Sequence, residues 1–200
     1  PGVGRRASVW DGPADSVYAG TEQSVTVTAV SDAAEIAVAG GRTDKRLAPF
    51  RVAPEDVDMV DVGSGETHSR RRIFHILGNK HADRAGNLLV SELYADPGCW
   101  SGYPPHKHDE DREGETLHEE VYHFRFRPET GFGAQYCWNE GEEPVVHMTK
   151  NGDTFLLDRG YHPTATSPFH EEYIFTILVG KTSRSLIQHF DTKFDYLMDQ

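Results

Sequence analysis

Hydrophobic and polar residues alternate with a period of two in many short segments of the chain, whereas helical periodicity is almost absent. Alternation places successive side chains on opposite faces of an extended chain, so it predicts half-buried β-strands. Such segments lie at residues 24–30, 35–38, 72–77, 87–94, 119–127, 132–138, 145–149, 154–158, 173–179 and 184–190. Clusters of Gly, Pro, Asn and Asp separate them, and only residues 54–58 and 193–198 look briefly helical. The pattern predicts an all-β sandwich or barrel.

The strand pattern breaks between residues 61 and 72, where Gly, Ser and basic residues interrupt the alternation. All eleven histidines lie beyond residue 65, so the first part of the chain carries no obvious metal chemistry. We therefore predict a structural N-terminal half at residues 1–65 and a metal-binding half at residues 66–200.

Composition narrows the possible partners. The net charge of −12 disfavours nucleic acid, because an acidic surface repels phosphate backbones. No segment approaches the roughly 18 unbroken apolar residues of a membrane helix, so no membrane partner is expected. The two cysteines, Cys99 and Cys137, lack C-x-x-C spacing and are expected to be reduced thiols of a cytoplasmic protein. Because exposed sheet edges are commonly covered by a second subunit, a homo-oligomer is also expected.

His106 and His108 form an H-x-H pair. Pro104 and Pro105 precede the pair and restrict the backbone there. On an extended chain, the two imidazoles share one face about 6.6 Å apart, a spacing that suits adjacent positions on one ion. A carboxylate, Glu120, and a third histidine, His162, follow downstream. Three neutral imidazoles and one carboxylate are a common ligand set for divalent Zn, Mn or Fe. Taken singly, each histidine could equally be an ordinary loop residue.

Glu120 opens a strand whose next residues on the same face are Tyr122, Phe124 and Phe126. A carboxylate that heads an inward-facing aromatic row is costly unless a cation meets it, and a metal ion would do so. The alternative register buries Val121 and turns Glu120 outward.

Five segments carry a resemblance to a known family. They are Ser-Gly-Tyr-Pro-Pro-His-Lys-His-Asp at 101–109, Glu-Glu-Val-Tyr-His-Phe-Arg-Phe at 119–126, Thr-Gly-Phe-Gly at 130–133, Asn-Gly-Asp at 151–153 and Gly-Tyr-His-Pro at 160–163. The pattern resembles the cupin fold and, more closely, the bacterial 5-deoxy-glucuronate isomerases of inositol catabolism. The acidic insert at 109–119 is longer than the general cupin motif allows, but it is normal in this narrower family.

The resemblance implies a cupin-type antiparallel β-barrel or jelly roll, in a bicupin whose N-terminal half is incomplete here. It implies a metal-dependent aldose–ketose isomerase that converts 5-deoxy-glucuronate, a small sugar acid, into its 2-keto isomer, 5-dehydro-2-deoxy-gluconate. The metal ligands would be His106, His108, Glu120 and His162. Tyr122 and Tyr161 are candidates for hydrogen bonds to substrate oxygens. A purely structural role in packing is an equal alternative for either residue.

Two other interpretations stay open at this point. A related uronate isomerase or an Fe-dependent dioxygenase could use the same ligands, and a non-enzymatic cupin could bind a sugar acid without turnover. Lys107, between the two histidines, is expected to point away from the metal into solvent. Arg125 and Arg127 are expected on the outward face of their strand. The sequence does not identify the residue that binds the substrate carboxylate.

Overall fold

The long central strand β8 (His118–Arg127) shows the alternation that its sequence predicts. His118, Glu120, Tyr122, Phe124 and Phe126 are buried, and the intervening residues are half-buried or exposed. Glu120 therefore points inward with the aromatic row, and the register that would bury Val121 is wrong. The predicted outward placement of the two arginines of this strand is confirmed, since both pair with carboxylates on the outer side.

The computed structural model describes residues 2–198, which form antiparallel sheets. A six-stranded sheet has the order β11 (Thr154–Leu157), β8, β13 (Glu171–Gly180), β5 (Leu88–Ala95), β4 (Arg71–Leu77) and β3 (Asp58–Val62). A four-stranded sheet has the order β10 (Val145–Lys150), β9 (Phe132–Cys137), β12 (Thr164–Thr166) and β6 (Trp100–Ser101). This nearly all-β, antiparallel architecture confirms the cupin-type fold class.

Two short ladders and three 3-10 turns complete the chain. One ladder joins β1 (Ser16–Tyr18) to β2 (Phe50–Val52), and the other joins β7 (His106–Lys107) to β14 (His189–Phe190). The turns are η1 (Pro54–Asp56), η2 (Asn79–His81) and η3 (Thr192–Leu197), which fit the two briefly helical segments expected from the sequence and add one more. No helix within residues 2–198 is long and apolar enough to cross a membrane.

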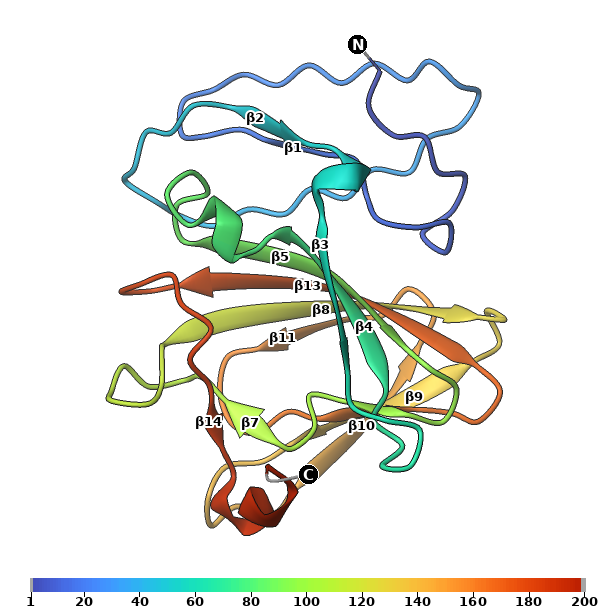
Figure 1. Cartoon of the computed structure of the whole chain (residues 1–200), viewed down its shortest axis with the longest axis vertical. Helices are drawn as coiled ribbons and strands as arrows, with labels where there is room; N and C mark the ends of the chain where they lie inside the picture. The colour runs from blue at the N-terminus through green and yellow to red at the C-terminus, as the bar shows by residue number, and fades with distance from the viewer. Residues whose placement is uncertain (1, 199–200) are drawn as a thin grey trace.

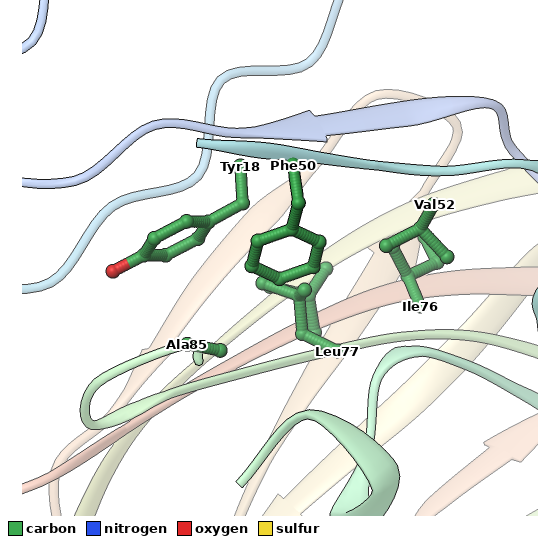
Figure 2. Close-up of a cluster of buried hydrophobic side chains, with 7 residues drawn as sticks. Tyr18, Phe50, Val52, Ile76, Leu77 and Ala85 are labelled. Carbon is green, nitrogen blue, oxygen red and sulfur yellow. The ribbon is translucent and has the colours of Figure 1, made fainter. Parts of the chain in front are cut away.

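The large sheet lies between two layers (Figure 1). Its inner face packs against the small sheet through a buried cluster that includes Phe124, Phe126 and Ile174. Its other face is covered by the N-terminal segment, where Tyr18 and Phe50 pack on residues of β4 and β5 (Figure 2). Burial of each large side chain contributes about 1.5–3 kcal/mol, so both layers stabilise the sheet.

A buried carboxylate fixes the N-terminal layer to the sheet. Glu92 is fully buried on β5, where its carboxylate pairs with Arg6 and accepts hydrogen bonds from the Ala14 amide and the Tyr173 hydroxyl, each at 2.9 Å. Because each oxygen of Glu92 has a donor, the charge is compensated away from water. These contacts join residues more than 70 positions apart in the chain.

Three strand predictions are wrong in whole or in part. Residues 24–30 and 35–38 form no strand, and Val25, Val27, Val30 and Val38 are exposed. The alternation is present there, but within the described residues these segments have no neighbouring strand to supply hydrogen bonds or cover the apolar side. Of residues 184–190, only His189–Phe190 forms a strand.

The predicted boundary at residue 65 falls in the turn between β3 and β4. These two strands pair with each other from Asp58↔His75 to Val62↔Arg71 in the large sheet. A hairpin of one sheet therefore spans the boundary, and the division into two cupin-like halves stays a prediction.

A second buried carboxyl group, Glu172 on β13, lies at the inner face without a partner among the described residues. It faces the small sheet at Gly133, where an added Cβ would meet Thr149 Oγ1 at 2.7 Å and Glu172 Oε1 at 2.9 Å. Burial raises the pKa of Glu172 to about 8, so this carboxyl group is mostly protonated at neutral pH.

We predict that Glu92→Gln lowers the free energy of unfolding by about 3 kcal/mol, because it leaves the partly buried Arg6 without its counter-charge. Chemical denaturation measured by circular dichroism tests this value. Glu22→Gln is the matched control, since its ion pair with Arg46 is exposed and should contribute less than about 1 kcal/mol. Equal stability losses in the two variants would contradict the proposed role of Glu92.

A second prediction concerns pH. Between pH 4.5 and 8, Glu172 is protonated in the folded chain but ionised in the unfolded chain, so unfolding releases a proton. Wild-type protein should therefore lose stability relative to Glu172→Gln as the pH rises from 5 to 8, by about 3 kcal/mol in total. Glu171→Gln, on the outer side of the same strand, is the control. A difference between wild type and Glu172→Gln that does not change with pH would refute this expectation.

Candidate metal centre

Four predicted ligand residues come from three separate parts of the fold. His106 lies in β7, His108 follows that strand, Glu120 lies on the inner face of β8, and His162 lies in the loop before β12. All four side chains are buried, with exposed fractions of 9% or less. The ligand atoms of His108, Glu120 and His162 lie within 4.8 Å of one another, so these three residues could hold a metal ion.

The carboxylate is the centre of this group. Glu120 Oε2 lies 3.0 Å from His108 Nε2 and 3.2 Å from His162 Nε2. His106 lies next to them, with its ring centroid 5.1 Å from that of His162 and 6.3 Å from that of His108. The structure thus brings all four residues together, although His106 lies outside the closest group of ligand atoms.

Backbone carbonyl groups orient all three imidazole rings in the same way. Each Nδ1 atom faces a carbonyl oxygen, in the pairs His162–Gly160 at 2.7 Å, His108–His118 at 3.4 Å and His106–Pro104 at 3.4 Å. A carbonyl oxygen can only accept, so Nδ1 carries the proton, and the neutral ring then has its lone pair on Nε2. This tautomer is the one that a metal ligand needs, with Nδ1 held by a hydrogen-bond partner behind it.

The charges in the site also fit a cation. Burial acts to raise the pKa of Glu120, but hydrogen bonds and charges from His108 and His162 outweigh it and lower the pKa to about 2. Burial, together with the two neighbouring histidines, lowers the pKa of His106 to about 3, so this ring is neutral. Burial also acts to lower the pKa of His108, but Glu120 raises it on balance. A hydrogen bond from His108 Nε2 to the ionised Glu120 needs a proton on Nε2, so binding of a divalent ion would release that proton and leave a neutral ring with its lone pair on the ion.

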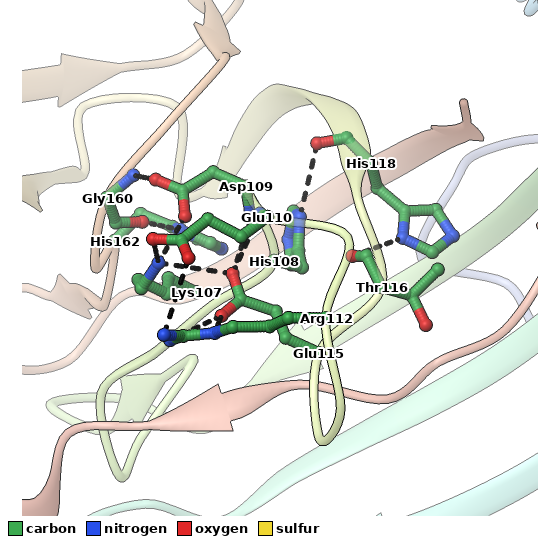
Figure 3. A network of polar contacts seen from close by, with 10 residues as sticks. All are labelled: Lys107, His108, Asp109, Glu110, Arg112, Glu115, Thr116, His118, Gly160 and His162. Carbon is green, nitrogen blue, oxygen red and sulfur yellow. Dashed lines mark hydrogen bonds and ion pairs between the residues drawn. The ribbon is translucent and has the colours of Figure 1, made fainter. Parts of the chain in front are cut away.

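Lys107 is buried, which corrects the expectation that it would be solvated. Its ammonium group pairs with Asp109, with Glu110 at 2.9 Å and with Glu115 at 3.2 Å (Figure 3). The side chain does point away from the histidines, as alternation predicts. However, the acidic insert folds over that face of the chain and replaces solvent.

The acidic insert connects this ion-pair cluster to the third histidine. Asp109 Oδ2 accepts a hydrogen bond from the Gly160 amide at 2.7 Å, and the Gly160 carbonyl accepts from His162 Nδ1 (Figure 3). Asp109 therefore holds the loop that places His162, without touching the imidazole itself. Glu119, on the outward face of β8, is exposed and pairs with Lys181 instead.

The two tyrosines occupy different surroundings. Tyr122 follows Glu120 on the inner face of β8, and its ring centroid lies 6.1 Å from that of His162. Tyr161 stacks on Trp138 at 5.7 Å and also lies near His189. Tyr122 is therefore placed to contact a molecule at the histidines, whereas the placement of Tyr161 favours packing.

A hollow of about 460 Å³ lies on the outer face of the small sheet, away from the large sheet. Its lining includes Trp100, Tyr136 and Trp138, whereas the neighbouring Ser101 and Gln135 face inward and are fully buried. None of the four candidate ligands lines this hollow. A smaller enclosed space is lined by His108, His118 and His162, and it is the one that belongs to the candidate site.

Sequence reasoning missed the roles of His118 and of the backbone carbonyls. His118 is buried beside His108, with ring centroids 5.8 Å apart, and its own carbonyl oxygen faces His108 Nδ1. Its position two residues before Glu120 on the alternating strand was a usable signal, because it predicts the same inward face.

We predict that Asp109→Asn weakens the binding of a divalent ion about 10-fold, because the loop that carries His162 loses its charged anchor. Competition of the purified protein with a chromophoric chelator for Zn²⁺ measures this affinity. Glu110→Gln is the matched control, since Glu110 also pairs with Lys107 but contacts no ligand loop. An unchanged Zn²⁺ affinity in Asp109→Asn would show that Asp109 does not position His162.

Known proteins resemble the chain over most of its length. The 5-deoxy-glucuronate isomerase of Shouchella clausii is 34% identical over 182 residues, which cover 89% of this chain and 65% of that protein. The isomerase of Geobacillus kaustophilus is 33% identical over 200 residues, or 98% of this chain and 70% of that protein. The chain thus spans about two thirds of the length of these relatives.

A solved structure supports the same relationship. The crystal structure of an IolB-like protein from Salmonella typhimurium matches with a TM-score of 0.71 and 28% sequence identity. The match covers 77% of this chain and 57% of that one. The family model of the KduI/IolB family matches residues 1–197. The chain therefore belongs to the KduI/IolB family.

Proposed function

We propose that this chain is a metal-dependent aldose–ketose isomerase that converts 5-deoxy-glucuronate into 5-dehydro-2-deoxy-gluconate. The observation that carries the proposal is the convergence of His108, Glu120 and His162, with His106 beside them, at one buried point. The relatives named 5-deoxy-glucuronate isomerase, each about a third identical, support the choice of substrate.

The residues fit a divalent ion. His106, His108, Glu120 and His162 would hold it, and we propose Zn, Mn or Fe because three nitrogens and a carboxylate suit each of them. A bound ion would supply Lewis-acid polarisation of substrate oxygen, which would acidify the C2 hydrogen and stabilise negative charge that develops on oxygen. The orientation of the three rings by backbone carbonyls keeps their Nε2 atoms available for such an ion.

Tyr122 would contribute a hydrogen bond to a substrate oxygen. Burial and the nearby Glu120 raise the pKa of Tyr122 well above its ordinary value, so its hydroxyl stays protonated. A protonated hydroxyl donates a hydrogen bond but cannot remove the C2 proton at neutral pH. Tyr122 is therefore a donor that stabilises developing charge on oxygen, and the C2 proton has to be removed by another group.

The decisive experiment compares activity before and after metal removal. The purified chain is treated with a chelator and reloaded with Zn²⁺, Mn²⁺ or Fe²⁺ separately, and conversion of 5-deoxy-glucuronate is followed by NMR. We expect no activity after chelation and recovery with at least one metal. Glu120→Gln should lower kcat/KM at least about 100-fold, whereas the exposed neighbour variant Glu119→Gln should stay close to wild type.

Each alternative result assigns a different function. No turnover of uronates with any of the three metals would reject the isomerase. Oxygen consumption by the iron-loaded sample would then identify a dioxygenase. Binding of a sugar acid without turnover would identify a binding module.

A further inference from the structure

Arg71, the first residue of β4, carries a half-buried positive charge without a carboxylate partner among the described residues. Its guanidinium donates to the Ser69 carbonyl at 2.8 Å and to the Tyr103 carbonyl at 3.1 Å. Among residues 2–198 no Asp or Glu lies within ion-pair distance of it. An arginine that is partly removed from water usually has an anionic partner, because desolvation of an unpaired charge is costly. This one keeps three N–H donors and its full charge for another group.

The position of Arg71 directs that charge toward the interior. Arg71 pairs with Ala95 in the register of the large sheet, and Ala95 pairs with Glu172. All three lie on the inner face, which β4 shares with Ile73 in the core between the sheets. Arg72, the next residue, lies on the opposite face over the Tyr94 ring.

One contact and one shared face connect Arg71 to the candidate metal centre. Tyr103, whose carbonyl it binds, precedes His106 by three residues in the segment that places this histidine. Tyr122 lies on the same inner face, in the buried cluster against which Ile73, the next inward residue of β4 after Arg71, packs. The inner face of the large sheet thus carries both Arg71 and the row of β8 that contains Glu120 and Tyr122.

Glu172 does not neutralise this arginine. Its carboxyl group faces Gly133 and Thr149 on the small sheet, and burial holds its pKa at about 8, so it is mostly uncharged at neutral pH. Lys107, a buried cation near the histidines, is already paired with three carboxylates. Arg71 is therefore a half-buried cation on the inner face whose charge can meet an incoming anion.

We propose that Arg71 binds the carboxylate of the sugar-acid substrate and so selects acids over neutral sugars. This inference rests on the proposed function. A planar guanidinium can hold a carboxylate through two parallel hydrogen bonds, and the contacts with Ser69 and Tyr103 fix it before the substrate arrives. The carboxylate of a hexuronate is at the opposite end of the carbon chain from the reacting carbons. An anion site beyond Tyr122 would thus hold the substrate with its aldehyde end at the histidines.

Arg159 is the rival candidate. It lines the small space next to His108 and His162, but its side chain is exposed. Water screens an exposed guanidinium, and ordering its flexible side chain costs entropy, so it gives weaker discrimination than a half-buried guanidinium that two carbonyl groups hold in place.

The test compares two probes that differ only in charge, D-glucuronate and its neutral amide D-glucuronamide. Calorimetric titration of the Zn²⁺-loaded chain should show a clear preference of the wild type for the acid. Arg71→Gln should weaken binding of the acid about 30-fold or more and leave binding of the amide nearly unchanged. It should also raise KM for 5-deoxy-glucuronate while Zn²⁺ content stays at the wild-type level. Arg72→Gln, on the opposite face of the same strand, is the matched control and should behave as wild type.

Arg71→Lys covers the case in which Arg71→Gln does not fold. Lysine keeps the charge but loses the paired donors, so its preference for the acid should be intermediate. The inference fails if both Arg71 variants keep the wild-type preference for the acid over the amide. It also fails if Arg159→Gln abolishes that preference while the Arg71 variants retain it. If the wild type turns over 5-deoxy-glucuronate and Arg71→Gln leaves its KM unchanged, only the role of Arg71 is rejected. If the wild type neither binds nor converts a uronate, the proposed function is rejected with it.

Discussion

A single buried carboxylate, Glu120, imposes the main constraint on this structure. It lies on the same strand face as Tyr122, Phe124 and Phe126, where an unpaired charge would be strongly unfavourable. The fold meets that constraint by bringing His108 and His162 to the same oxygen from two loops. The long ladder of β8 and β13 therefore positions the carboxylate, and the loops that carry His108 and His162 must lie against it to compensate its charge.

The closing of those loops depends on a second set of charges. Lys107 forms ion pairs with carboxylates of the acidic insert. In that insert, Asp109 accepts a hydrogen bond from the Gly160 amide, and the Gly160 carbonyl orients His162. The two halves of the metal centre are thus joined through an ion-pair cluster on the side of the chain opposite the histidines. Ion pairs hold these loops in place because the loops are polar and have few apolar side chains that could pack.

Much of this arrangement could be predicted from local sequence. The aromatic row that follows Glu120 favours the correct face of β8, and the H-x-H pair, Glu120 and His162 form a ligand group that the sequence predicts. The burial of Lys107 could not be predicted in this way, because alternation tells which face a side chain occupies but not what covers that face. The same limit explains residues 24–30, where a strand-like pattern has no partner strand in the described part of the chain. The sequence does not single out Arg71, because three arginines stand in a row and only the register of the sheet shows which one lies on the inner face.

The use of main-chain oxygens to hold the three rings has an evolutionary consequence. A carbonyl group is present whatever residue occupies the position, so changes of side chain at 104 or 118 leave the proton on Nδ1 as long as the backbone path is kept. Position 160 is the exception, because its φ is +82° and an added Cβ would meet the Trp138 carbonyl oxygen at 2.5 Å. The tautomer of these rings is thus independent of many side-chain substitutions at the positions that supply the carbonyl groups. Selection can alter the side chains around the rings, and with them the choice of ligand, without first having to rebuild the cation-binding geometry.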